Sequence, residues 1–208
     1  FTYYLGWHSH RYSANTMALA AYGNPLAYRS SKLFQFNQTT GKLVTHMTNN
    51  PYNPIKMVLE WAVEQGVDKK IPEPRYPDSE ITQKHMDLAW FIQNELENAL
   101  TKKVDHLVEE TGIRNICIAG GVGLNCVANR KILDVCNVDN LFIQPAAGDQ
   151  GQALGNAYYG YYKVLNNHRV ENKCFSPYLG FKQPKQSEIL SQLKQLSVDV
   201  KFDSLSSF

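Results

Sequence analysis

Two short apolar runs in the second half of the chain each end in a turn of small residues that leads into a helical pattern. In chain order, the predicted elements are a strand at Asn115–Ala119, a turn at Gly120–Gly123, a helix over Leu124–Cys136, a strand at Leu141–Gln144, a turn at Ala146–Gly151 and a helix over Gln152–Leu165. This repeated order predicts an α/β layered core. The first strand is almost continuously apolar, so we expect it to be buried on both faces.

The residues before this region predict irregular α+β structure. Apolar runs at Leu33–Phe36 and Leu43–Met47 flank a polar loop that contains glycine, a pattern typical of a hairpin. Asn53 followed by Pro54 predicts the start of a helix, and Gly66 predicts its end.

A long amphipathic helix is predicted from Ile81 to Thr111, because apolar positions recur close to the 3.6-residue period of an α-helix. Asp78 or Ser79 can cap its start, and Gly112 ends it. Two further elements are predicted near the C-terminus, a helix over Pro184–Leu196 and a strand over Val198–Phe202.

Composition and charge argue against two classes of partner. The 208 residues are 43% hydrophobic and 19% charged, which is ordinary for a globular protein, and the formal net charge is only +2. With so small a charge and scattered basic residues, we expect neither nucleic acid nor a membrane as a partner. No apolar run in the sequence approaches the length of a membrane span.

The four cysteines, Cys117, Cys126, Cys136 and Cys174, have neither the spacing of a CxxC metal site nor the density of a disulfide scaffold. Cys117 lies in an apolar run and Cys126 in a helical pattern, so we expect both to be buried free thiols. Free thiols are typical of a reducing compartment, which predicts a cytoplasmic protein.

The first small-residue turn is a candidate phosphate-binding loop. Its sequence, AGGVGLN, follows a predicted strand and opens a predicted helix, where glycine permits close approach of a ligand and free N–H groups attract phosphate. It matches neither a Walker A loop nor the dinucleotide fingerprint, and tight strand-to-helix packing explains it equally well. Asn125, expected in the first turn of the helix, can bind a ribose or phosphate, or equally cap the helix.

The second turn places a carboxylate, Asp149, after a strand and among glycines and alanines. Ligands of α/β sheets bind at the carboxyl ends of strands, so Asp149 can bind a metal there. Capping of the next helix is the structural alternative. Two such turns on neighbouring strands favour a ligand held from two sides.

His8 and His10 are two residues apart and would share one face of a strand, as a metal-binding pair does. The segment around them is polar and typical of a loop, which favours surface histidines.

Four segments in order resemble the nodulation-protein-type (NodU/CmcH-type) O-carbamoyltransferases, which include enzymes that carbamoylate aminoglycoside and cephalosporin antibiotics. The segments are Met17–Gly23 (MALAAYG), Ile118–Asn129 (IAGGVGLNCVAN), Phe142–Gly155 (FIQPAAGDQGQALG) and Ser176–Gly180 (SPYLG). Four ordered motifs are a far more specific signal than one glycine loop.

The resemblance implies a partial actin/hexokinase/Hsp70-like (ASKHA) ATPase fold with ribonuclease-H-like layers, similar to the domain that makes threonylcarbamoyladenosine in tRNA. It implies that residues 1–180 are the C-terminal portion of this domain and that residues 181–208 are a linker or the start of a YrdC-like domain. In the family, the YrdC-like domain forms carbamoyl adenylate from carbamoyl phosphate and ATP. The first domain then passes the carbamoyl group to a hydroxylated small-molecule acceptor, with a divalent metal, often iron, at the site.

Carried onto this sequence, the resemblance implies a set of binding residues. The residues matching the nucleotide-binding loop are Gly120, Gly121, Val122 and Asn125. Asp149 matches the metal-binding aspartate, and no catalytic residue is assigned.

Three departures from the family accompany these matches. His8-x-His10 does not reproduce the family's paired-histidine metal motif, which lies upstream of the region that this chain matches. Asn15 stands where the family commonly has lysine. The third departure is that we expect the chain to lack the family's YrdC-like domain beyond its possible linker at residues 181–208. With the paired histidines expected upstream as well, we expect the chain to lack an N-terminal segment and to be incomplete for catalysis alone.

Two other functions keep the same motifs. One is a tRNA-modifying threonylcarbamoyl transferase, which the weak basic charge and the SPYLG segment disfavour. The other is a non-catalytic nucleotide-binding module. A sugar kinase fits poorly, because the phosphate-loop pattern differs.

Overall fold

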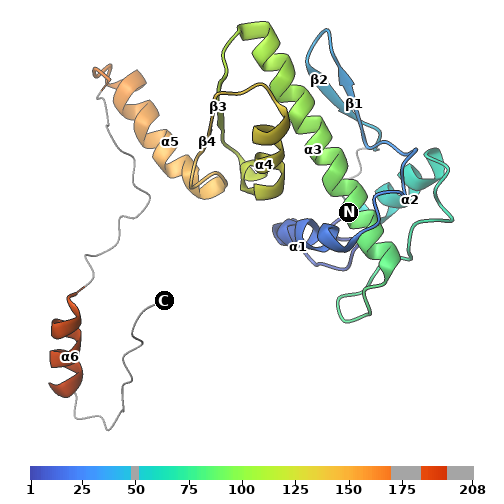
Figure 1. Cartoon of the computed structure of the whole chain (residues 1–208), viewed down its shortest axis with the longest axis horizontal. Coiled ribbons are helices and arrows are strands. Elements are labelled where there is room, and N and C mark those ends of the chain that lie inside the picture. The colour runs from blue at the N-terminus through green and yellow to red at the C-terminus, as the bar shows by residue number, and fades with distance from the viewer. Residues whose placement is uncertain (48–51, 170–183, 196–208) are drawn as a thin grey trace. The chain divides into compact units, whose positions relative to one another are not determined.

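The computed structural model describes residues 1–47, 52–169 and 184–195. The chain divides into two compact units, Phe1–Asn167 and His168–Phe208. The main elements of the first unit are α1 (Ser13–Leu19), β1 (Phe34–Asn37), β2 (Lys42–Thr45), α2 (Pro54–Glu64), α3 (Gln83–Thr111), β3 (Asn115–Ile118), α4 (Cys126–Val135), β4 (Asn140–Ile143) and α5 (Gln152–Tyr159) (Figure 1). Short 3-10 turns lie at His10–Tyr12, Ala20–Tyr22, Gly121–Leu124 and Asp149–Gly151, and a π-helical turn at Gly160–Val164 follows α5.

In the second unit, the described residues form α6 (Gln186–Gln195), which agrees with the helix predicted over Pro184–Leu196. The predicted strand at Val198–Phe202, the segment Ser176–Gly180, Cys174 and the domain boundary after residue 180 lie outside the described residues. Within the described part of the chain, no helix is both long enough and apolar enough to cross a membrane.

One hydrophobic cluster surrounds the N-terminal half of α3. The indole of Trp61 on α2 stacks on Phe91 of α3, with ring centroids 5.2 Å apart. Leu88 on α3, Leu5 and Val58 are fully buried beside them. Each buried side chain of this size contributes about 1.5–3 kcal/mol of transfer free energy, so α3 is held mainly by packing.

The hairpin and α2 form where local signals predict them. β1 pairs antiparallel with β2, with Gln35 opposite Val44. The Asn53 side chain accepts a hydrogen bond from the Lys56 N–H at 3.0 Å, so it is the N-cap of α2. Gly66, just beyond the helix, has a φ of +66°, which favours glycine.

The predicted cap of α3 at Asp78 or Ser79 is wrong, because α3 begins after Thr82. The Thr82 N–H donates to Nδ1 of His85 at 3.1 Å, so the third helical residue reaches back to the cap. Ser79 is instead used in a turn, where its hydroxyl donates to the Tyr76 carbonyl at 2.8 Å. The end of α3 is as predicted, since Gly112 adopts a φ of +70°.

A second cluster lies where α3 and α4 cover the β3–β4 sheet. The two strands are parallel, with Ile116 opposite Leu141. Ile132 of α4 is fully buried, and Val104 of α3 packs in the same cluster. The α/β character predicted from the repeated strand, turn and helix is confirmed.

The prediction that β3 is buried on both faces is wrong for this chain. Ile116 and Ile118 are half-buried under the two helices, whereas Asn115 and Cys117 are exposed on the other face. The reason is that α3 and α4 pack on one face only, while most residues of α5 are exposed. The alternation of burial along β3 is that of a strand covered on one side.

The prediction that Cys117 and Cys126 are buried is also wrong. Cys117 and Cys126 are free and exposed, whereas Cys136 at the end of α4 is free and buried.

Candidate functional site

The two predicted turns meet at one edge of the β3–β4 sheet. Because the strands are parallel, both turns follow carboxyl ends, the usual position of ligand sites in α/β sheets. The Gly120 N–H donates to the Ala147 carbonyl across 2.7 Å, which joins the two turns directly. Together they line a hollow of about 230 Å³ that includes Gly120, Gly148, Asp149 and Gln152.

The first turn differs from the prediction in one respect. We expected the helix to open at the glycines, but a 3-10 turn at Gly121–Leu124 intervenes and α4 begins at Cys126. Ala119 and Gly120, just before this 3-10 turn, line the hollow, and the residues of α4 do not. Gly120 has a φ of +99°, which favours glycine, and a Cβ on Gly123 would lie in tight contact with Ile118 at 3.2 Å and with Ala147 at 3.3 Å.

Asn125 is the N-cap of α4. Its Oδ1 accepts a hydrogen bond from the Ala128 N–H at 3.0 Å. The capping alternative is therefore confirmed, and Asn125 lies before the first turn of the helix and not within it. Its role as a ligand of the nucleotide stays a prediction.

The second turn presents Asp149 to solvent. Asp149 is the first residue of the 3-10 turn that precedes α5, and no side chain caps that turn or α5. The capping alternative for Asp149 is therefore not supported. The carboxylate is exposed at the border of the hollow, as a ligand-binding group must be.

Gly151 keeps the second turn closed. A Cβ at this position would overlap the Ala146 carbonyl oxygen, and the Gly151 N–H donates to the Gly148 carbonyl at 3.0 Å. The sequence AAGDQG thus folds back on itself, which brings Asp149 beside the first turn.

Asp149 can supply one ligand to a metal ion. Among the described residues, no group of three or more histidine, cysteine, aspartate or glutamate side chains is placed to hold a metal. His8 and His10 are exposed in irregular structure and a 3-10 turn, as expected of surface histidines, and the His8 ring contacts Tyr12. A divalent cation at Asp149 would therefore need further ligands from outside this set.

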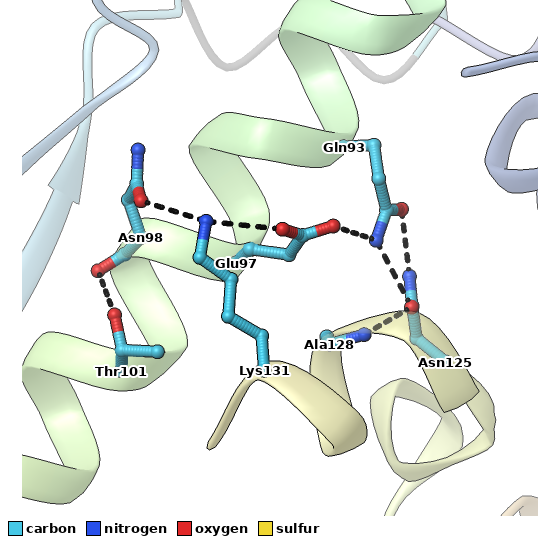
Figure 2. Close-up of polar contacts among 7 residues, drawn as sticks. All are labelled: Gln93, Glu97, Asn98, Thr101, Asn125, Ala128 and Lys131. Atoms are coloured by element: carbon cyan, nitrogen blue, oxygen red, sulfur yellow. Dashed lines mark hydrogen bonds and ion pairs between the residues drawn. The ribbon is translucent and has the colours of Figure 1, made fainter. Parts of the chain in front are cut away.

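The sequence did not indicate three polar residues that are linked to Asn125 through Gln93. Gln93 and Glu97 on α3 and Lys131 on α4 form a chain of contacts that ends on the Asn125 amide (Figure 2). Gln93 and Glu97 are four residues apart and therefore share a helix face, but their partners are more than 30 positions away. The only available signal was a glutamine close to the apolar stripe of α3.

The segment Met17–Gly23 packs against α3 near these residues. A Cβ on Gly23 would overlap the Met86 carbonyl oxygen and the Trp90 side chain, so glycine lets the end of this segment touch the α3 backbone. A second hollow, of about 370 Å³, lies between this segment, α3 and α4, with Met17, Gln93 and Lys131 among its lining residues.

These features define an α/β domain with two turns that line one hollow at the carboxyl edge of its parallel strands. Residues 1–158 match the family model described as the carbamoyltransferase N-terminus. The chain therefore belongs to the carbamoyltransferase N-terminus family.

Individual relatives agree with this assignment. An uncharacterized protein of Synechocystis is 33% identical over 98% of this chain and 33% of its own length. Nodulation protein NolO of Bradyrhizobium diazoefficiens is 33% identical over 61% of this chain and 24% of its own length. Nodulation protein NolNO of Sinorhizobium fredii is 33% identical over 57% of this chain and 18% of its own length. The chain thus spans about a third or less of these proteins.

Proposed function

We propose that this chain supplies part of the nucleotide and metal site of an ATP-dependent O-carbamoyltransferase. The carbamoyl group would pass from carbamoyl adenylate, made from carbamoyl phosphate and ATP, to the hydroxyl of a small-molecule acceptor. The observation that carries the proposal is the hydrogen bond between Gly120 and Ala147, which makes two family-motif turns into one site.

The nucleotide would contact the first turn, through the backbone of Gly120, Gly121 and Val122. The Gly120 N–H is already donated to the Ala147 carbonyl. The anion would therefore be bound by the N–H groups of Gly121 and Val122, which lie at the start of the 3-10 turn and have no partner within it. A hollow of about 230 Å³ is smaller than the roughly 300–1,000 Å³ of pockets that enclose a whole small molecule. This chain would therefore bind one part of ATP or of the adenylate, and other parts of the enzyme would bind the rest.

Asp149 would hold the divalent metal, for which the family resemblance favours iron. Its exposed carboxylate, at the border of the same hollow, fits one position of an oxygen- and nitrogen-rich ligand set. A metal bound there would supply Lewis acidity toward the carbamoyl group. Asp149 itself would fix the position of the metal relative to the first turn.

The fold and cellular location belong to the same proposal. The β3–β4 pair, with α3 and α4 on one face, would be one part of an actin/hexokinase/Hsp70-like domain completed by an N-terminal segment and followed by a YrdC-like domain. The free thiols of Cys117, Cys126 and Cys136 support a reducing compartment such as the cytoplasm.

The decisive experiment uses the full-length protein with carbamoyl phosphate, ATP and a pool of hydroxylated acceptors. We expect AMP to form only when carbamoyl phosphate is present, together with a carbamoyl mass increment on an acceptor. AMP formation that is independent of carbamoyl phosphate, or no product at all, would contradict the proposal.

A substitution at the site tests the residues. Asp149→Asn keeps the shape of the side chain but removes its charge, so we expect lower metal content and loss of carbamoyl transfer. Asp139→Asn is the matched control, because Asp139 precedes β4 at the opposite end of the strand and pairs with Arg114 at 2.8 Å. Equal metal content in the wild type and Asp149→Asn would contradict the metal assignment.

A further inference from the structure

Gln93 and Asn125 join α3 to the glycine turn through a pair of amide hydrogen bonds. Gln93 Nε2 donates to Asn125 Oδ1 at 3.1 Å, and Asn125 Nδ2 donates to Gln93 Oε1 at 2.9 Å. Figure 2 shows the two amides facing each other between the helices. The bonds are reciprocal, so each amide fixes which end of the other is oxygen.

The orientation of Gln93 is itself fixed by a charged pair. Gln93 Nε2 also donates to Glu97 Oε1 at 2.8 Å, and a carboxylate accepts hydrogen bonds only. The NH₂ group of Gln93 must therefore face Glu97. Lys131 Nζ lies 3.1 Å from Glu97 Oε2, which holds the carboxylate from the α4 side.

This network is largely shielded from water. Gln93 is 7% exposed, and the side chain of Glu97 is 12% exposed. Within the described residues, no fully buried side-chain nitrogen or oxygen lacks a hydrogen-bond partner. A buried network that is fully satisfied holds one arrangement, because breaking any link leaves a costly unpaired group.

Asn125 connects this network to the glycine turn. Its oxygen accepts two hydrogen bonds, from Gln93 and from the Ala128 N–H, and one of its two Nδ2 hydrogens is used by Gln93. The Asn125 N–H donates to the Val122 carbonyl at 3.0 Å, and Asn129 Nδ2 donates to the Gly123 carbonyl at 2.8 Å. The glycine turn is thus tied to α4 at two points, and α4 is tied to α3 through Gln93.

We propose that Gln93 is a positioning residue for the nucleotide turn: it holds the Asn125 amide in one orientation, with the Glu97–Lys131 pair as its support. This inference rests on the proposed nucleotide site, in which the turn at Gly120–Val122 contacts the ligand. Gln93 acts through Asn125 and does not itself need to touch the nucleotide.

The test measures ATP affinity of the full-length protein by titration calorimetry. Gln93→Leu removes the amide, and Gln93→Glu removes its donors while keeping its shape, so one variant remains informative if the other does not fold. We expect ATP affinity to fall about tenfold in both, by analogy with residues that orient metal ligands, whose removal costs about 10- to 100-fold. Ile132→Val is the control, because it weakens the α3–α4 core away from the amide pair and should lower the melting temperature without changing ATP affinity.

A double-variant cycle separates positioning from general stability. Asn125→Ser keeps a capping hydroxyl for α4 but removes the amide. If Gln93 acts through Asn125, adding Gln93→Leu to Asn125→Ser costs no further ATP affinity. A merely structural role predicts that the two losses multiply, which would overturn the inference.

The cycle also distinguishes this inference from the proposal beneath it. If Asn125→Ser weakens ATP binding and Gln93→Leu binds ATP like the wild type, positioning by Gln93 is wrong while the nucleotide site stands. If Asn125→Ser binds ATP like the wild type, both the assignment of Asn125 to the site and the role of Gln93 are wrong.

Discussion

The Gly120 N–H and the Ala147 carbonyl are joined by a 2.7 Å hydrogen bond, so the turn after β3 is in direct backbone contact with the turn after β4. Neither residue contributes a side-chain functional group to this contact. The geometry of the candidate site therefore depends on how tightly each backbone turn is closed, and substitutions that open a turn should act on ligand binding.

Gly151→Ala should open the second turn. Its methyl group would overlap the Ala146 carbonyl oxygen, so we expect reduced stability and strongly reduced ATP and metal binding, measured by calorimetry and metal analysis. Gly155→Ala is the matched control four residues later, where a Cβ meets nothing within 4 Å. Alanine is favoured over glycine inside a helix by about 1 kcal/mol, so this control should be neutral or stabilising. Equal binding by the two variants would refute the tight-turn account.

Stability should fall in acid because of His85. This residue is 7% exposed, and its Nδ1 accepts from the Thr82 N–H, so the ring proton lies on Nε2, which is 3.2 Å from the Glu73 carbonyl. Burial, with a smaller contribution from Arg75, lowers the pKa of His85 below its ordinary 6.5, although the Glu73 carbonyl opposes the shift. As the pH falls below 6.5, the unfolded chain binds a proton that the folded chain does not, and stability is lost until the pH reaches the lower folded pKa.

Melting temperatures measured across this pH range check the effect. His85→Gln should flatten the dependence, whereas His10→Gln, at an exposed residue, should leave it unchanged. A wild-type profile that is no steeper than that of His85→Gln would contradict the assignment.

The three described cysteines should differ in reactivity. Burial is the main cause that raises the pKa of the Cys136 thiol to about 12, with Asp105 adding to the shift, whereas Cys117 and Cys126 are exposed. Because the thiolate is the reactive form, Cys136 should resist a maleimide at neutral pH until the protein unfolds. Peptide mapping after a timed reaction with the maleimide measures the extent of labelling at each cysteine. Rapid labelling of Cys136 in the folded protein would contradict the prediction.

The core beneath α4 should respond to single truncations according to side-chain direction. Ile132→Ala removes a fully buried side chain, so we expect a loss of about 2–5 kcal/mol in the free energy of unfolding. Leu133→Ala, at the next residue, changes a side chain that is 48% exposed and should cost about 0.5 kcal/mol or less. Urea titrations of both variants measure the difference, and similar losses would mean that α4 is rotated from the orientation described.

Local signals predicted the fold best. The Asn53 cap, the glycine ends at Gly66 and Gly112, and the order of the α/β elements all appear as expected, because each depends on backbone preferences within a few residues. The start of α3 was missed because Thr82 and Ser79 are both good caps, and the choice between them depended on the turn that Ser79 makes with Tyr76.

Contacts between residues far apart in the chain could not be predicted from the sequence. The two turns of the site were correctly placed after neighbouring strands, but the bonds from Gln93 to Asn125 join residues 32 positions apart. The exposed face of β3 was also missed, since an apolar strand does not reveal how many of its faces are covered. Burial of this kind is decided by which elements pack together, and periodicity within one element cannot report it.

One helix serves both hydrophobic clusters. Leu88 and Phe91 of α3 belong to the first cluster and Val104 belongs to the second, with Gln93 and Glu97 between them. Loss of α3 from either cluster therefore removes part of the other, which makes the first unit a single cooperative folding block. Probes placed at Trp61 and at Ile132, in different clusters, should report the same unfolding midpoint.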